Sequence, residues 1–161
     1  MDSSIRSLLD PDRDWVHQTM IAEWGSEIAV VHGDVYRPAE LPAFVAEEKG
    51  EKVGLLTYHI DGDACEIVTL NSWREGSGVG SALIEAVKQA ARRKKCRRLW
   101  LVTTNDNLHA LRFYQKRGFT ISNVRVNAVE ASRKLKPEIP LLGKDGIPIR
   151  DEIELEILLP M

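Results

Sequence analysis

The sequence lacks any apolar run long enough to cross a bilayer, any metal-binding or redox spacing of cysteines, and any large excess of one charge. A transmembrane helix needs about 20 predominantly apolar residues, and residues 1–6 do not resemble a secretory signal. The two cysteines, Cys65 and Cys96, are expected to be small buried apolar residues. A net charge of −2 gives no electrostatic reason to bind nucleic acid or a membrane. We therefore expect a cytoplasmic protein without a metal site.

The 161 residues, 43% of them hydrophobic and 29% charged, have the composition of one ordinary globular domain, residues 1–161. Apolar periodicity, glycines and prolines divide the chain into strands and helices. The expected strands are residues 5–9, 44–47, 53–60, 64–70, 99–103, 119–126 and 153–157, and the expected helices are residues 10–24, 79–94, 107–117 and a short one ending at 135. Residues 26–41 are expected to be irregular, with room for a short helix, and a long loop precedes the last strand. This order predicts a mixed α/β sheet in a single domain.

The segment Arg74-Glu75-Gly76-Ser77-Gly78-Val79-Gly80-Ser81 joins an expected strand to an expected helix. Glycine at every second position leaves backbone N–H groups uncovered, and the helix start adds unpaired N–H groups and a positive dipole end. These features predict a phosphate site, and a tight turn without a ligand is the alternative. A Walker loop is excluded because no Gly-Lys-Ser/Thr follows the glycines. A dinucleotide loop fits poorly because Ser81 takes the third glycine position.

A second motif lies downstream, and six of its residues follow the pattern Asn-x-x-Ala-x-x-Phe-Tyr-x-x-x-Gly-Phe: Asn107, Ala110, Phe113, Tyr114, Gly118 and Phe119. With this motif and the glycine loop, the chain resembles the GNAT family of acetyl-CoA-dependent N-acetyltransferases. The family's loop motif is Gln/Arg-x-x-Gly-x-Gly/Ala, in which Gly78 and Gly80 match and Glu75 replaces the Gln/Arg. A carboxylate at that place repels a pyrophosphate unless it turns outward or binds Arg74.

The resemblance implies the family's fold, a mixed and largely antiparallel sheet of about seven strands, splayed between the fourth and fifth strands, with helices on both faces. Acetyl-CoA is then the cosubstrate, and its pantetheine arm pairs with the free edge of the fourth strand at residues 69–72. The Leu70 N–H is placed at the thioester carbonyl, and the pyrophosphate on the N–H groups of residues 76–81. The implied cofactor-binding residues are Leu70, Asn71, Ser72, Gly76, Ser77, Gly78, Val79, Gly80, Ser81 and Asn107.

The resemblance also places Tyr114 as general acid, because a phenol O–H beside the sulfur can protonate the leaving thiolate. The alternative is that Phe113 and Tyr114 both anchor their helix in the core. For the base that deprotonates the acceptor ammonium, the sequence offers Glu66, an acid in an apolar strand, four residues before Leu70 and hence on the same face. A Glu66 that pairs with Arg or Lys, or faces solvent, is the alternative interpretation. The other candidate bases are His59 and water.

Three residues are candidates for the acceptor side of the site: Trp24, Tyr36 and His59. The acidic residues of the last strand either attract a cationic amine or form the exposed face of that strand: Asp151, Glu152, Glu154 and Glu156. The basic run at residues 92–98 is expected to be a solvated helix end, because cations stabilise a helix C-terminus.

We therefore expect an N-acetyltransferase that moves an acetyl group to a primary amine by direct attack in a ternary complex, without an acetyl-enzyme. A small-molecule amine is favoured over a protein acceptor, because we expect a compact domain without a peptide-reading extension. A homodimer is common in small domains of this type. A non-catalytic acyl-CoA-binding or sensor domain on the same fold is the alternative, and a nicotinamide-dependent oxidoreductase is a third possibility.

Overall fold

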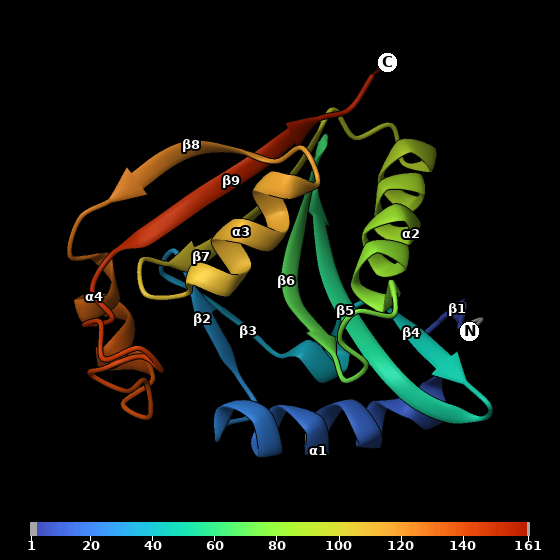
Figure 1. Ribbon diagram of the computed structural model, residues 1–161, viewed down its shortest axis with the longest axis horizontal. Coiled ribbons are helices and arrows are strands. Elements are labelled where there is room, and N and C mark those ends of the chain that lie inside the picture. Colours follow the sequence, from blue (N-terminus) through green and yellow to red (C-terminus); the bar gives the residue numbers. More distant parts are fainter. Residues whose placement is uncertain (1–2, 161) are drawn as a thin grey trace.

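The computed structural model describes residues 3–160, and its main feature is a mixed sheet of seven strands in the order β1-β4-β5-β6-β7-β9-β8 (Figure 1). The strands of this sheet are β1 (Ser4–Ser7), β4 (Ala43–Glu48), β5 (Glu51–Asp61), β6 (Ala64–Ser72), β7 (Arg98–Thr104), β8 (Thr120–Arg125) and β9 (Glu152–Leu158). The α-helices are α1 (Arg13–Trp24), α2 (Val79–Arg93), α3 (Leu108–Lys116) and α4 (Ala128–Leu135). The predicted mixed α/β fold with a largely antiparallel sheet is confirmed.

The sheet opens between its fourth and fifth strands, β6 and β7. These two strands are the parallel pair of the sheet, and their pairing covers only residues 64–67 of β6 and 98–101 of β7. Beyond these residues the strands are not paired, and their ribbons separate in Figure 1. The predicted splay is therefore present, and it exposes main-chain groups of β6 at the centre of the molecule.

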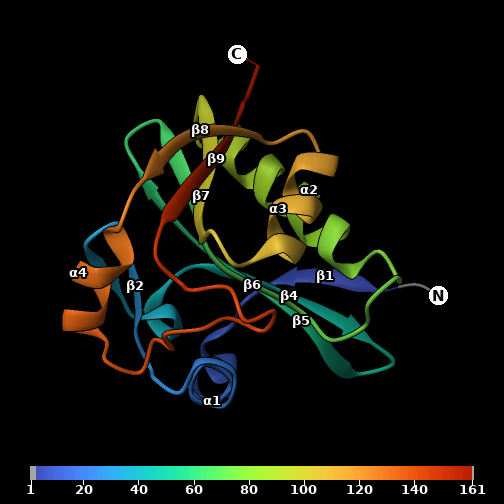
Figure 2. The ribbon, with the colours of Figure 1, turned by 60° about the vertical axis from the view of Figure 1, so that its left-hand side comes forward.

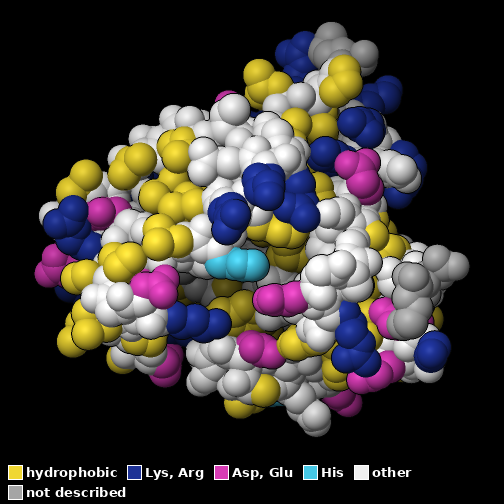
Figure 3. Space-filling model, in the orientation of Figure 1, with side chains coloured by type: hydrophobic (Ala, Val, Ile, Leu, Met, Phe, Trp, Pro, Cys, Tyr) yellow, Lys and Arg dark blue, Asp and Glu magenta, His cyan; other side chains and the backbone are white. Residues whose placement is uncertain are grey.

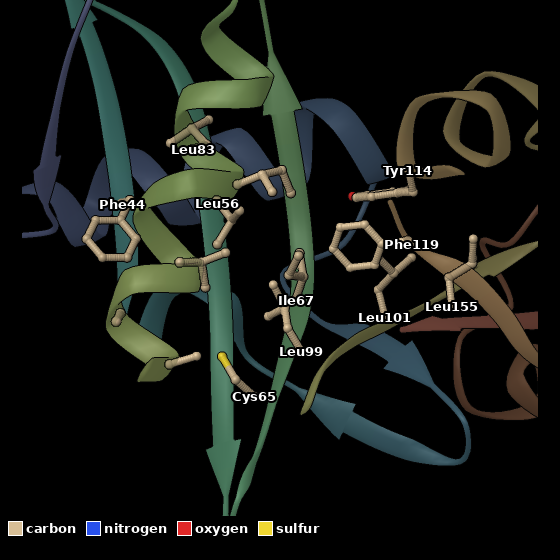
Figure 4. Close-up of a cluster of buried hydrophobic side chains, with 14 of the residues drawn as sticks. Phe44, Leu56, Cys65, Ile67, Leu83, Leu99, Leu101, Tyr114, Phe119 and Leu155 are labelled. Atoms are coloured by element: carbon tan, nitrogen blue, oxygen red, sulfur yellow. The ribbon is translucent and has the colours of Figure 1, made fainter. Parts of the chain in front are cut away.

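Helices cover both faces of the sheet (Figure 2). On one face, α2 buries an apolar stripe with helical spacing, and α3 adds Tyr114 to the same core. Figure 4 shows this core, with Leu83 of α2 over Leu56 of β5, and Tyr114 over Phe119. On the other face, α1 packs Val16 and Met20 against a smaller set of strand residues: Ala43, Val45 and Leu55. Among the described helices, none is both long and apolar enough to cross a bilayer.

Residues 26–41 contain a β-hairpin that the sequence pattern did not predict. Its strands are β2 (Ala29–Val31) and β3 (Asp34–Tyr36), and a single 3-10 turn follows at Pro38–Glu40. Strands of three residues are too short to give a recognisable alternation. The hairpin depends on distant contacts, because the main-chain N–H of His32 at its turn donates to the Glu152 carboxylate over 3.0 Å.

The expectation that the last strand presents an exposed acidic face is wrong. β9 lies inside the sheet between β7 and β8, and Glu152 and Glu154 are only 4% and 9% exposed. Arg98 and Arg125 pair with Glu154, and Arg125 does so over 2.6 Å. The alternating pattern of β9 identified a strand, but it could not show that β8 covers the far edge of that strand or that arginines pair with Glu154 and Glu156.

Candidate active site

The diverging strands border a cavity of about 550 Å³. Its near wall consists of residues 67–70 of β6, residues 101–104 of β7, and residues of α3 with the preceding Asn107. Its far wall includes residues 29–31 of β2, residues of α4 and the segment that follows α4, and the end of α1 and Glu152 of β9 complete the lining. Figure 3 shows a hollow in this face, with hydrophobic side chains inside it and charges of both signs around it. A cavity of this size suits a small-molecule ligand.

The predicted site residues fall into three groups. Four of them line the cavity, namely Trp24, Leu70, Asn107 and Tyr114. The glycine loop, together with Asn71 and Ser72, follows the cavity-lining part of β6 along the chain. The third group is Tyr36, His59 and Glu66, which are gathered in a separate cluster under the hairpin.

A β-bulge in β6 changes which side chains share a face. Thr69 pairs with Thr57 of β5, but Ile67 pairs with the next residue of β5, so Val68 is the extra residue. Leu70 therefore packs into the core under α2, whereas Glu66 faces the hairpin on the other side. The prediction that Glu66 and Leu70 lie on one face is wrong, because the spacing argument assumed a regular strand.

The glycine loop has the features that a pyrophosphate requires. Gly76 and Gly78 have left-handed φ angles of +75° and +83°, and Gly78 is the N-cap of α2. Within residues 3–160, no group accepts a hydrogen bond from the main-chain N–H groups of Gly78 and residues 79–81. Gly80 also has to be small, since a Cβ there would lie 2.9 Å from the Phe113 ring. The loop therefore fits a phosphate group bound by main-chain N–H groups and a helix dipole.

Glu75, which departs from the family's loop motif, is exposed and makes no ion pair with any described residue. Arg74 does not bind it but pairs with Glu51 over 2.7 Å. The structure instead brings Arg117 to the loop from the end of α3. Its Nε donates to the Ser81 hydroxyl over 2.9 Å, and its guanidinium lies 3.6 Å from the centre of the Phe113 ring. Arg117 is therefore a cation beside the glycine loop that the sequence did not single out.

Tyr114 belongs to both the core and the cavity. Its ring contacts Phe113 and Phe119 edge-on at centroid distances of 5.1 and 5.3 Å, and its hydroxyl is directed toward β6 in Figure 4. Tyr114 lines the cavity, and its hydroxyl makes no hydrogen bond within the described part of the chain. Burial raises the pKa of Tyr114, so the phenol keeps its proton at neutral pH. A protonated, unpaired hydroxyl is what a general acid requires.

Two further cofactor candidates carry amide side chains. Asn107 is the N-cap of α3, and its Oδ1 accepts the Ala110 N–H over 3.1 Å. This bond leaves the Asn107 amide NH₂ available as a donor at the cavity wall. Asn71 has a buried Oδ1 for which the described residues supply no donor. A buried acceptor without a donor is rare, and a ligand with an N–H group can satisfy it.

Glu66 is only 2% exposed and is held by two groups of the hairpin. His32 Nε2 donates to one carboxylate oxygen over 2.8 Å, and the Tyr36 hydroxyl donates to the other over 2.7 Å. Asp34 lies 3.4 Å from the other ring nitrogen of His32, and the Tyr36 ring contacts His59 at a centroid distance of 5.4 Å. Glu66 is therefore paired, as its burial requires, but its partners are histidine and tyrosine rather than arginine or lysine.

This cluster predicts a pH-dependent stability. The Glu66 hydrogen bond raises the pKa of His32 despite burial. Because the pKa of His32 is higher in the folded than in the unfolded chain, protonated His32 stabilises the fold fully at pH values below the ordinary histidine pKa of about 6.5. This stabilisation is lost as the pH rises through the raised pKa. His32→Gln should therefore lower the thermal midpoint more at about pH 6 than at about pH 9. Thermal unfolding across that range tests this, with His109→Gln at an exposed histidine as control. An equal loss at both pH values would contradict the assignment.

Comparisons with known proteins agree with this geometry. The family model described as "Acetyltransferase (GNAT) family" matches residues 5–119. The chain is 45% identical over 144 residues to YxbD of Bacillus subtilis (strain 168), which covers 89% of this chain and 91% of that protein.

Two solved structures share the fold. One is an IAA acetyltransferase from Bacillus cereus ATCC 14579, with a TM-score of 0.71 at 18% identity, covering 98% of this chain and 100% of that chain. The other is a Bacillus subtilis acetyltransferase in complex with CoA, with a TM-score of 0.69 at 18% identity, covering 99% and 100%. Since the family model spans well over half of the sequence, this chain belongs to the GNAT acetyltransferase family.

Proposed function

We propose that this protein transfers the acetyl group of acetyl-CoA to a primary amine of a small molecule, by direct attack in a ternary complex. Family membership implies acetyl-CoA-dependent acetylation. The observation that carries the proposal is that one cavity contacts both the free edge of β6 and a far wall that includes β2 and α4. Cofactor and acceptor can therefore meet without a covalent carrier on the protein.

Particular residues are suited to each part of this reaction. Bound acetyl-CoA supplies an activated acyl thioester. Leu70 lines the cavity, and its main-chain N–H is suited to stabilising negative charge on the carbonyl oxygen. Tyr114 can give its proton to the departing sulfur. The glycine loop, assisted by Arg117, holds the pyrophosphate and so orients the thioester.

Glu66 stays a predicted base, but its surroundings support a positioning role. It is absent from the described lining of the cavity, and both of its carboxylate oxygens are occupied by hairpin side chains. Because residues 29–31 of that hairpin form part of the far wall, Glu66 is suited to holding the wall in place. We propose that Glu66 acts on the acceptor through the hairpin.

Glu66→Gln separates the two roles. A positioning role predicts a raised KM for the amine and an unchanged pH profile, with kcat within about threefold of wild type. Tyr36→Phe, which removes one of the two hydrogen bonds, should change KM in the same direction. Steady-state kinetics across pH measure this. A fall of about 100-fold in kcat with loss of the ionisation from the pH profile would identify Glu66 as the base.

The function as a whole is tested by thermal shift with acetyl-CoA, followed by a panel of primary amines assayed for free thiol and for the acetylated product by mass spectrometry. We expect stabilisation by acetyl-CoA but not by NAD(P)H, and turnover of some small amines. Binding without turnover of any amine or peptide would favour the sensor alternative. The cytoplasmic location and the homodimer stay predictions.

A further inference from the structure

Two buried charges of opposite sign line the far part of the cavity. Glu152, at the start of β9, is 4% exposed, and Lys136, at the end of α4, is 7% exposed. Both residues contribute to the cavity wall. Figures 1 and 2 show α4 beside β2. The two charges bind the main chain on either side of β2, Lys136 at Ile28 and Glu152 at His32.

Neither charge has a counter-ion among the described residues. The Glu152 carboxylate accepts one hydrogen bond, from the main-chain N–H of His32, and forms no ion pair. The Lys136 ammonium donates to the Ile28 carbonyl over 3.0 Å, which uses one of its three donors. The acid whose charge acts on Lys136 is the exposed Glu138, which forms no ion pair with it, and Glu152 and Lys136 do not pair with each other.

Unpaired buried charges are costly, because only the attraction of an opposite charge and further hydrogen bonds can offset the hydration that each ion loses. Burial lowers the pKa of Lys136, which is the response of an ammonium that lacks an anion. Each group has a main-chain hydrogen-bond partner, but within residues 3–160 neither forms an ion pair. A ligand that enters the cavity can supply both, with a cation for Glu152 and an anion for Lys136.

We propose that the acceptor is an amino carboxylate, whose ammonium binds Glu152 and whose carboxylate binds Lys136. The inference rests on the proposed function, because it names the substrate class of the same site. The reaction forms the amide C–N bond and breaks the thioester C–S bond. Of the two protons that the ammonium loses, one passes by way of Glu152 to solvent, and the other ends on the sulfur of coenzyme A.

Matched acceptors test this assignment. Amino acids of different chain length are compared with the amines that lack the carboxylate and with the corresponding amino acid amides, at saturating acetyl-CoA. We expect acetylation of amino carboxylates in preference to both sets. Equal or better turnover of the amines without a carboxylate would overturn the inference and leave the acetyltransferase function standing.

Variants separate recognition from structure. Lys136→Gln should lower kcat/KM for the amino carboxylate on the order of 10- to 100-fold. It should leave kcat/KM for the carboxylate-free amine nearly unchanged. Lys134→Gln, an exposed lysine on the same helix, should change neither. If Lys136 has only a structural role, through its bond to Ile28, Lys136→Gln would lower kcat/KM for both acceptors alike. That result would count against the proposal. Glu152→Gln should weaken the binding of every amine acceptor, because it removes the carboxylate that binds the ammonium.

A binding measurement covers the case in which nothing is acetylated. Thermal shift of the protein saturated with coenzyme A is measured with amino carboxylates and with their carboxylate-free amines. Stabilisation by the amino carboxylates that is lost in Lys136→Gln would support the ligand class even if the catalytic proposal fails. Absence of both stabilisation and turnover by amino carboxylates would overturn the inference.

Discussion

Tyr114→Phe is expected to lower kcat by about 100-fold or more while acetyl-CoA affinity stays within about twofold of wild type. The variant keeps the ring that packs against Phe113 and Phe119 and removes only the hydroxyl. Because no described residue hydrogen-bonds this hydroxyl, its loss should not lower the thermal midpoint. Steady-state kinetics and thermal shift with coenzyme A measure the two effects separately.

Tyr58→Phe is the matched control. Tyr58 is another tyrosine of the same core, partly buried and stacked on Phe44 at a centroid distance of 5.6 Å, and it is not part of the cavity wall. Its hydroxyl should be dispensable for kcat. If Tyr114→Phe behaved like Tyr58→Phe, the Tyr114 side chain would be a core anchor and the leaving thiolate would take its proton from elsewhere.

Gly78→Glu is expected to weaken coenzyme A binding on the order of 100-fold or more, because a carboxylate would face the bound pyrophosphate. An ideal Cβ at Gly78 meets nothing within 4 Å, so the folded chain accepts the side chain. The left-handed φ of +83° adds strain of about 1–2 kcal/mol. Isothermal titration with coenzyme A measures the affinity.

Gly62→Glu controls for that strain. Gly62 also has a left-handed φ, +63°, and an ideal Cβ there also meets nothing within 4 Å, but it lies in the turn before β6, at the other end of the strand. The two variants should lose similar thermal stability, and only Gly78→Glu should lose coenzyme A. If Gly78→Glu kept its affinity for coenzyme A, the pyrophosphate would bind somewhere other than this loop.

Motifs made of contiguous residues could be predicted from the sequence because their chemistry is local. Gly76 and Gly78 permit the left-handed turn of the loop, and the start of α2 that follows leaves main-chain N–H groups free. The strand and helix order likewise follows from local apolar periodicity. The family resemblance led to the correct fold because it too rests on motifs of contiguous residues.

Other features of the site depend on contacts between distant residues. The bulge at Val68 reverses the faces of β6, and no local pattern marks it. The β2–β3 hairpin is held at His32 by Glu66 and Glu152, from two different strands. A three-residue strand has too few side chains to show periodicity, so its existence could not be predicted from its own residues.

The sequence by itself determined the family resemblance, the order of elements, the glycine loop and the place of Tyr114 in its motif, because each rests on neighbours along the chain. Only the tertiary structure decided that Glu66 is bound by the hairpin, that Arg117 lies beside the loop, and that Lys136 and Glu152 both line one cavity without counter-ions. The physical reason is that burial and ion pairing are properties of the packed chain, in which residues far apart in sequence set the electrostatic environment of each group.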